Sequence, residues 1–249
     1  MIAGIFNAQR LRAWRAAAMH FFLSRNMGAM VINNNTYSMV VAFDGTPIES
    51  TKPDDRTLAM GAYSGYHGHH GATVVCVSSV CGVIVGSSRV FGGHDNDLTV
   101  HDGSAFNGVL NDVVLRGRLL ADPLTPNFIA AADGIFNETT YVATTKQIHM
   151  NDAERERSKA LSAFRVHVEH SFAELKNYFK KLKFGANLRW GQNLIEPIII
   201  LSILLSNCRI CLEGRSQSSQ RFGVPVPTLE EYLNETHDQI TIDLINNYL

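Results

Sequence analysis

The sequence has few cysteines, the residues that form disulfides and many structural zinc sites. It contains only four cysteines among 249 residues, which is too few for a disulfide scaffold. The cysteines form two close pairs, Cys76 with Cys81 and Cys208 with Cys211, and zinc binding is the alternative that such pairs offer. Because the first pair lies among strand-like residues and the second ends an apolar helix-like run, we interpret all four as small buried thiols. This interpretation fits a reducing compartment.

The sequence also lacks an excess of charge of either sign, and its charged content of 18% is ordinary for a soluble globular protein. Lys and Arg number 22 and Asp and Glu 23, which gives a net charge of −1 with ten histidines uncounted. Nucleic-acid-binding proteins often carry a basic excess. Here an excess occurs only locally, at Lys176, Lys180, Lys181, Lys183 and Arg189. A solvated helix face is the alternative interpretation of this cluster, so the charge neither identifies nor excludes a nucleic-acid partner.

The sequence also lacks a long uninterrupted hydrophobic run. The longest, residues 194–205, is broken by a Glu-Pro pair and is too short to span a bilayer, so we expect a buried helix there. Near the N-terminus, Arg10, Arg12 and Arg15 interrupt the apolar residues, which excludes a signal-peptide pattern. We therefore expect an intracellular globular protein, large enough to bury a core of useful size.

The remaining sequence alternates between strand-like and helix-like segments. Strands are predicted at 37–43, 72–80, 82–90 and 127–132, the second and third forming a hairpin around Cys81-Gly82. Helices are predicted at 7–25, 98–110, 152–183 and 191–212. Turns are expected at 44–47 and 92–97, a loop at 50–71, a linker at 214–220 and a peripheral tail from 228. This order predicts an α/β protein with a mixed sheet and helices packed on it.

Two aspartates directly follow apolar strand-like segments. Asp44 comes after YSMVVAF and Asp133 after NFIAAA. Ligands bind at the carboxyl ends of strands in open α/β sheets, so both carboxylates are expected at a binding edge. The alternative for each is an aspartate that begins a turn or caps a helix.

A glutamate lies at the edge of the buried face of the predicted helix at 152–183. At 100° per residue, one apolar stripe contains Phe164, Val168, Leu175, Phe179 and Leu182. Glu169 lies beside this stripe with Arg165 and Lys176, and an Arg165–Glu169 ion pair worth a few tenths of a kcal/mol is the alternative role. Carboxylates from two strand ends and a following helix provide the oxygen ligands that two divalent ions need for phosphodiester cleavage.

Five short segments together resemble the motifs of one known family. They are Asp44-Gly45-Thr46 (D-G-T), Tyr63-Ser64-Gly65 with Gly71 (S-G-K-x-x-x-x-G), Gly93-His94-Asp95-Asn96-Asp97 (G-S-x-H/N-D), Asp133-Gly134-Ile135-Phe136 (D-x-G-Y/F, with the glycine one place early) and the run from Arg165 through Glu169 to Lys176 (R-x3-E-x6-K). Over residues 38–212 the chain resembles the DDE transposases of the bacterial insertion-sequence type and their eukaryotic PIF/Harbinger relatives.

The resemblance implies a ribonuclease-H-like α/β fold, a mixed sheet flanked by helices, over residues 37–212. Residues 1–36 would then be an N-terminal helical segment, and 213–249 a linker with a peripheral tail. The family's activity is a metal-dependent DNA endonuclease or transposase reaction that cuts and joins phosphodiester bonds by a two-metal mechanism. DNA is the implied partner, and the nucleus is the implied location if the source is eukaryotic. A separate DNA-binding protein that supplies target recognition and a homo-oligomer remain open as further partners.

The resemblance also assigns roles to individual residues. Asp44, Asp133 and Glu169 would be catalytic and would bind Mg²⁺ or Mn²⁺. Asp97 would be a further metal ligand, with a helix N-cap as its alternative role. Arg165 and Lys176 would contact DNA phosphates or orient Glu169.

Some positions depart from the family pattern. Ser162 stands where a tyrosine is usual, and the basic residues of the S-G-K loop are replaced by Tyr66, His67, His69 and His70. The 36 residues before the first predicted strand are too few for the family's helix-turn-helix. These departures favour an alternative, a catalytically inactive, domesticated transposase-derived protein that binds DNA or a protein. An unrelated α/β protein with coincident acids is the third possibility.

Overall fold

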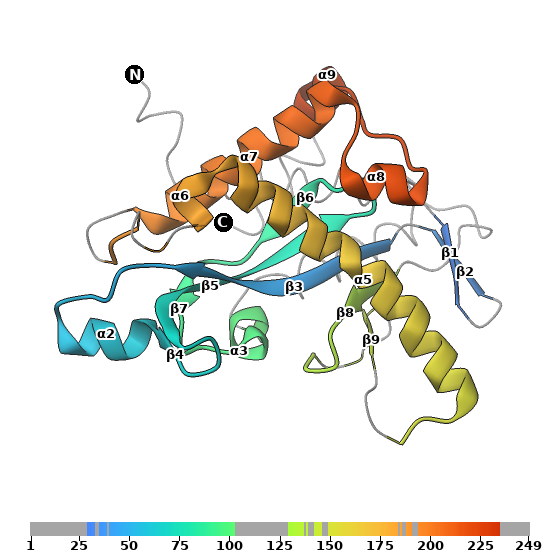
Figure 1. Cartoon of the computed structure of the whole chain (residues 1–249). Coiled ribbons are helices and arrows are strands. Elements are labelled where there is room, and N and C mark those ends of the chain that lie inside the picture. Colours follow the sequence, from blue (N-terminus) through green and yellow to red (C-terminus); the bar gives the residue numbers. More distant parts are fainter. Residues whose placement is uncertain are drawn as a thin grey trace, which may run out of the picture.

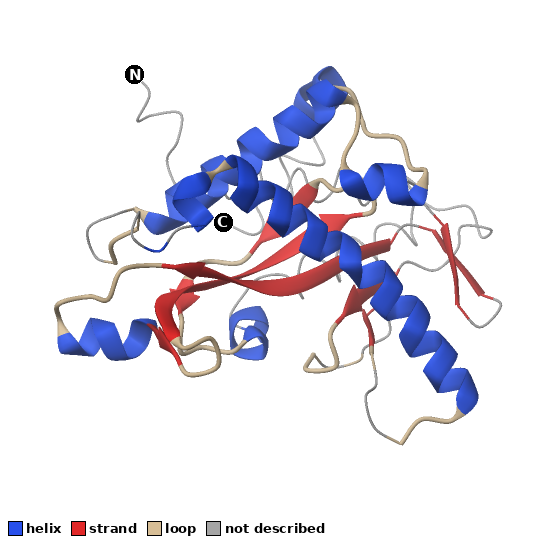
Figure 2. Ribbon diagram, viewed as in Figure 1, coloured by secondary structure: helices blue, strands red, loops and turns tan. Residues whose placement is uncertain are grey.

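The computed structural model describes residues 29–32, 35–38, 40–102, 129–136, 138, 142–145, 149–183, 185, 188–190 and 194–234. The helix predicted at 7–25, the later part of the one at 98–110 and the end of the C-terminal tail lie outside these residues. Within the described part, helices lie against a twisted sheet (Figure 1), and the layers are distinguished by colour in Figure 2.

The sheet combines antiparallel and parallel strands. Its path runs through β4 (Tyr63–Ser64), β5 (His69–Ser79), β3 (Val40–Glu49), β8 (Ile129–Ala132) and β9 (Val142–Thr144), while β6 (Ile84–Ser87) and β7 (Phe91–Gly92) pair with β5 off this path. β3 is antiparallel to β5, whereas β3, β8 and β9 are parallel. A separate hairpin joins β1 (Ala29–Ile32) and β2 (Asn35–Ser38). The predicted fold class is confirmed, because this mixed sheet flanked by helices is compatible with a ribonuclease-H-like fold.

Strand β3 is longer than the sequence indicates. The turn predicted at 44–47 is wrong, because this segment continues the strand and pairs with β5 as far as Glu49. β8 pairs with β3 only up to Ala42, so the other edge of β3 is open beyond that residue. Pro47, which has no N–H to donate, is tolerated at such an edge. Its carbonyl oxygen accepts a hydrogen bond from Lys176 Nζ at 2.7 Å. Asp44 therefore lies within a strand and not at its end.

The polar segments around β4 and β7 contain two short helices. The loop predicted at 50–71 is wrong in part, because α2 (Arg56–Ala62) forms there and leads directly into β4. Asp55 caps this helix, its Oδ1 accepting the Leu58 N–H at 2.8 Å. After β7 and a polar turn, α3 (Asp97–Asp102) begins close to the predicted position.

The long predicted helix is present as α5 (Asp152–Tyr178) followed by α6 (Lys180–Lys183). The predicted capping box is confirmed: the Asn151 side chain accepts the Glu154 N–H at 2.9 Å, and the Glu154 carboxylate accepts the Asn151 N–H at 3.1 Å. The backbone leaves the helical conformation at Phe179, with φ −102° and ψ 80°, which separates the two helices.

Apolar cores fill both faces of the sheet. The core that contains the α5 stripe includes Phe164, Val168, Leu175 and Leu182. From β3, Ala42 and Ile48 join this core, whereas Val41 and Phe43 belong to the core on the other face. Because side chains alternate along a strand, Asp44 faces the same side as Ala42, toward α5.

Three helices follow α6. Among the described residues, α7 (Ile195–Glu213) is the one helix long and apolar enough to cross a membrane, and half of it is buried inside the protein, as in a core helix. The linker predicted at 214–220 is wrong in part, because Ser216 caps α8 (Gln217–Phe222) by accepting the Ser219 N–H at 2.9 Å.

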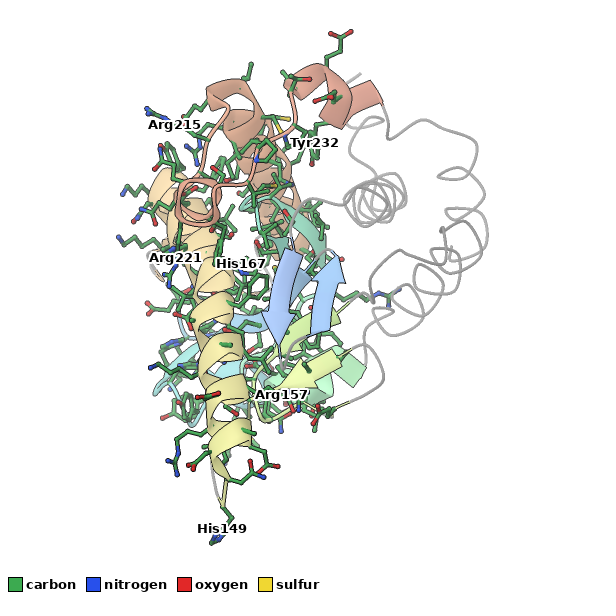
Figure 3. The ribbon with its side chains drawn as sticks, turned by 90° about the vertical axis from the view of Figure 1, so that its right-hand side faces the viewer. His149, Arg157, His167, Arg215, Arg221 and Tyr232 are labelled. Atoms are coloured by element: carbon green, nitrogen blue, oxygen red, sulfur yellow. The ribbon has the colours of Figure 1, made fainter. Side chains whose placement is uncertain are left out.

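The last described helix, α9 (Leu229–Asn234), packs on α7. Tyr232 is fully buried, and its hydroxyl accepts a hydrogen bond from Asn207 Nδ2 at 3.0 Å (Figure 3). The start of the predicted peripheral tail is therefore part of the core.

Candidate active site

Two aspartates from neighbouring strands reach the same place in the structure. β3 and β8 are parallel, and their register pairs Val40 with Ile129. Four residues further along each strand, Asp44 and Asp133 reach the same level and the same face. Arg165 of α5 lies between them, with Nη2 3.3 Å from Asp44 Oδ2 and Nη1 3.5 Å from Asp133 Oδ1. The structure thus brings together two of the three predicted catalytic acids.

A third carboxylate, that of Asp97, lies near this pair, against the residue that follows Asp44. Asp97 begins α3 and lies directly against Gly45, where any side chain would clash with its carboxylate. Glycine is needed at this position because of the close approach. The capping oxygen of α3 comes from Asn96, whose Oδ1 accepts the Thr99 N–H at 2.8 Å. The Asp97 carboxylate is therefore not used as the helix cap.

Burial and mutual repulsion raise the pKa values of two of these acids. Burial raises the pKa of Asp44 to about 6, with Arg165 lowering it and the charges of Asp97 and Asp133 raising it further. The pKa of Asp97 is also raised, chiefly by burial, with His67 and Arg165 lowering it and Asp133 raising it. Like charges held together in a desolvated place disfavour their own ionisation. A cation is the ligand that relieves this repulsion.

Asp133 is held by its own turn and by β9. Its Oδ1 accepts the Gly134 N–H at 2.6 Å and the Thr145 hydroxyl at 3.3 Å. Gly134 packs against the Thr145 carbonyl, where a side chain would clash. Phe136 packs edge-on against Phe43, with ring centroids 4.9 Å apart. Phe136, the aromatic residue of this motif, is thus buried in the core and holds in place the turn that carries Asp133.

The other predicted site residues lie on α5 at the margin of this cluster. Glu169 is exposed one turn beyond Arg165, whose ion pairs run to the two aspartates. Lys176 donates hydrogen bonds to Thr46 Oγ1 at 2.8 Å and to the Pro47 carbonyl at 2.7 Å, and burial lowers its pKa. Lys176 therefore attaches α5 to β3, and the roles of Glu169 at the metal and of Lys176 at DNA stay predictions.

Two features of the cluster were not predicted from the sequence. Arg165 was expected to contact DNA phosphates or to orient Glu169, yet its guanidinium lies between the carboxylates of Asp44 and Asp133. Its Nε is buried without a hydrogen-bond partner. His67 lies in an exposed turn within the loop predicted at 50–71. Its effect on Asp97, whose pKa it lowers against the larger effect of burial, was not predicted. Gly45 of the D-G-T motif is the sequence feature that could have indicated the approach of Asp97, because a glycine within a strand often marks a place where another group comes close.

The donor set of this cluster suits a divalent cation. Within the described ranges, no group of three or more His, Cys, Asp or Glu side chains is arranged to hold a metal ion as it stands. The Arg165 guanidinium lies where positive charge is required, between Asp44 and Asp133. Carboxylate oxygens are the ligands that Mg²⁺ and Mn²⁺ prefer. These acids therefore fit such an ion in chemistry, once the arginine gives way.

A hollow of about 520 Å³ lies elsewhere, between α5, α7 and the start of α8. The Arg209 guanidinium stacks on the Tyr178 ring there, 3.7 Å from its centroid. Arg209 also pairs with Glu174 at 3.0 Å and with Glu213 at 2.9 Å. Because both carboxylates of this hollow, those of Glu174 and Glu213, are paired with Arg209, the hollow offers a cation less than the Asp44 cluster does.

Comparison with known proteins agrees with this geometry. The profile of one family, described as DDE superfamily endonuclease, matches residues 43–207. This range includes all six predicted site residues and most of the described sheet. Neither the comparison with curated proteins nor that with solved structures gives a significant match. On the profile match, the chain belongs to the DDE superfamily endonuclease family.

Proposed function

We propose that this chain is the catalytic domain of a PIF/Harbinger-type transposase, which cuts and joins phosphodiester bonds of DNA by a two-metal mechanism. The observation that carries the proposal is the convergence of Asp44 and Asp133 on Arg165, with the Asp97 carboxylate against the adjoining Gly45. Membership of the endonuclease family supports the reaction class. The five sequence motifs support the PIF/Harbinger subtype.

The proposal gives each site residue a role. Asp44 and Asp133 would hold the divalent ions from two parallel strands, and Asp97 would add a ligand from α3. Glu169 is the third catalytic carboxylate, because it lies one turn from Arg165 on the same helix. When bound, Mg²⁺ or Mn²⁺ activates the attacking water and stabilises the leaving oxygen of the phosphodiester. Arg165 balances the charge of Asp44 and Asp133 in the structure. With the ions bound, it would instead contact a DNA phosphate.

The same proposal assigns partners and location. DNA is the substrate, a separate DNA-binding protein supplies target recognition, and the active form is a homo-oligomer. The protein acts in the nucleus if its source is eukaryotic. These assignments rest on the PIF/Harbinger resemblance alone.

A second candidate is a catalytically inactive, transposase-derived protein that binds DNA or a protein. The exposed position of Glu169 and the ion pairs of Arg165 favour it, because they leave the acids neutralised by the chain itself. The two candidates differ in one property, which is metal-dependent cleavage.

Nicking of a supercoiled plasmid tests the proposal. The wild-type chain is expected to nick the plasmid with Mg²⁺ or Mn²⁺ and not with EDTA. Asp133→Asn is expected to abolish nicking, because it removes a negative ligand, whereas Asp54→Asn changes an exposed aspartate outside the cluster and should leave nicking intact. Nicking by Asp133→Asn at the wild-type rate would overturn the catalytic assignment. Plasmid binding that ignores metal, without nicking, would favour the inactive protein.

A further inference from the structure

A row of aromatic rings projects from the tip of the hairpin between β4 and β5. We propose that Tyr66, His67 and His69 form a stacking platform for unpaired nucleotides of the DNA strand that enters the acid cluster. This inference rests on the proposed function and deepens it, because it specifies a substrate with unpaired bases beside the cut.

The rings form a continuous series. Tyr66 is 93% exposed and packs edge-on against His67, with centroids 4.9 Å apart. His67 in turn stacks on His69, with centroids 5.5 Å apart and planes inclined by 17°. The outer ring therefore offers its surface to solvent, while the inner two support it from behind.

The backbone of the hairpin holds these rings in place. Ser64 is buried, its hydroxyl accepts the His67 N–H at 3.2 Å, and its carbonyl accepts the Gly68 N–H at 2.8 Å. Gly68 adopts a φ of +72°, which closes the turn. Ser64 of β4 and His69 of β5 are the strand partners that flank the turn. An exposed tyrosine on a fixed turn loses little conformational freedom when a ligand stacks on it.

The platform is continuous with the acid cluster. His67 is near enough to Asp97 to offset part of the rise in the pKa of that acid, a rise that burial causes. The segment that leads to Asp97 is tied to the same hairpin, since Gly93 N–H donates to the Gly71 carbonyl at 3.0 Å. Figure 1 shows the β4–β5 hairpin near α3, and α3 contacts β5. A strand whose phosphodiester reaches the aspartates therefore passes this hairpin.

Unpaired nucleotides are the partner that this chemistry fits. Every base offers a π-face, so stacking on aromatic rings binds single strands without sequence preference. The bases of an intact duplex are already stacked on each other and cannot use such a ring. The hairpin carries histidines where the resembling family carries basic residues, so contact here depends on rings more than on fixed positive charge.

The test uses the full chain in EDTA, so that binding is measured without cutting. The probes are a blunt DNA duplex and the same duplex extended by a short single-stranded tail that carries 2-aminopurine, whose fluorescence falls when it stacks. The wild type is expected to bind the tailed duplex more tightly and to quench its fluorescence. Tyr66→Ala should weaken tailed-duplex binding by at least about fivefold and remove the quenching. Tyr66→Phe keeps the ring and should restore both.

Tyr178→Ala serves as the matched control, because it removes another exposed tyrosine ring, one packed against Arg209 on a different surface. Its binding and quenching should equal the wild type. Equal binding of blunt and tailed duplex by the wild type, or unchanged quenching in Tyr66→Ala, would overturn the platform. Metal-dependent nicking without quenching refutes the platform and leaves the proposed function intact. Quenching that depends on Tyr66, in a chain that neither binds metal nor nicks, supports the platform and refutes the catalytic function.

Discussion

Replacing Asp44 with asparagine should stabilise the protein when no divalent ion is present. In the folded chain the pKa of Asp44 is raised from 3.8 to about 6, first by burial. Such a rise in pKa corresponds to about 3 kcal/mol of unfolding free energy at a pH well above 6. Asparagine removes the buried charge while keeping nearly the same shape, so about 3 kcal/mol is the upper limit of the gain.

The pH dependence fixes the sign of this effect. Above pH 6, Asp44 is ionised in both the folded and unfolded chains, and the full cost of its burial is present. Below pH 3.8, it is protonated in both states and the cost disappears. The free energy of unfolding of the wild type therefore falls as the pH rises from about 4 to about 6, because Asp44 ionises in the unfolded chain first. The advantage of Asp44→Asn should shrink toward zero over the same interval as the pH falls.

Urea unfolding in EDTA at pH 8 and near pH 4 measures both quantities. Asp54→Asn is the matched control, because Asp54 is exposed and should change stability little at either pH. A variant Asp44→Asn that is less stable than the wild type at pH 8 would refute the reasoning. It would mean that the ion pair with Arg165 outweighs the cost of burying Asp44.

Two further substitutions test the packing around the cluster. Gly45→Ala places a Cβ against the Asp97 carboxylate and should cost about 1–3 kcal/mol of unfolding free energy, whereas Gly65→Ala, which has open space at its Cβ, should cost little. Thermal denaturation compares the two, and equal melting temperatures would contradict the close approach of Asp97. Lys176→Met removes the hydrogen bonds to Thr46 and Pro47 and should cost about 1–3 kcal/mol in urea unfolding. Lys181→Met, at an exposed position, is its control, and equal loss in both variants would show that the Lys176 contacts do not stabilise the fold.

The layers of the fold could be predicted because their signals are local. The Asn151 capping box and the apolar stripe of α5 follow from residue spacing within one helix. The β5–β6 hairpin follows from Gly82, whose φ of +89° closes the turn between two Val-rich runs. These features depend on neighbours in the chain, and the structure confirms them.

The errors occurred where tertiary contacts override local preference. Asp44-Gly45-Thr46-Pro47 has the composition of a turn, yet pairing with β5 keeps it extended. The serine-rich segment after α7 has the composition of a linker, yet the Ser216 capping box begins a helix there. In the site, Asp44 and Asp133 could be predicted from the strands before them. The place of Arg165 could not, because it depends on how α5 crosses β3 and β8.

Closeness in sequence to the site residues does not place a histidine in the site, as the buried His167 shows. His167 lies on the face of α5 that packs on the sheet (Figure 3), within the same helix as Arg165 and Glu169. Its ring nitrogens face the Phe164 carbonyl at 2.6 Å and the Ser78 carbonyl at 3.0 Å. Burial lowers its pKa, so it belongs to the core and not to the acid cluster.

Calorimetric titration of Mg²⁺ and Mn²⁺ tests the central claim most directly. The account predicts that the wild type binds a divalent ion and that Asp44→Ala abolishes this binding, because Asp44 and Asp133, which both pair with Arg165 in the structure, are the carboxylates proposed to hold the ion. Glu169→Ala in the same titration decides whether the exposed glutamate joins the ligands, and weaker binding is the expected result. Metal binding that survives both substitutions, or that is absent even with DNA present, would contradict the catalytic assignment of this site.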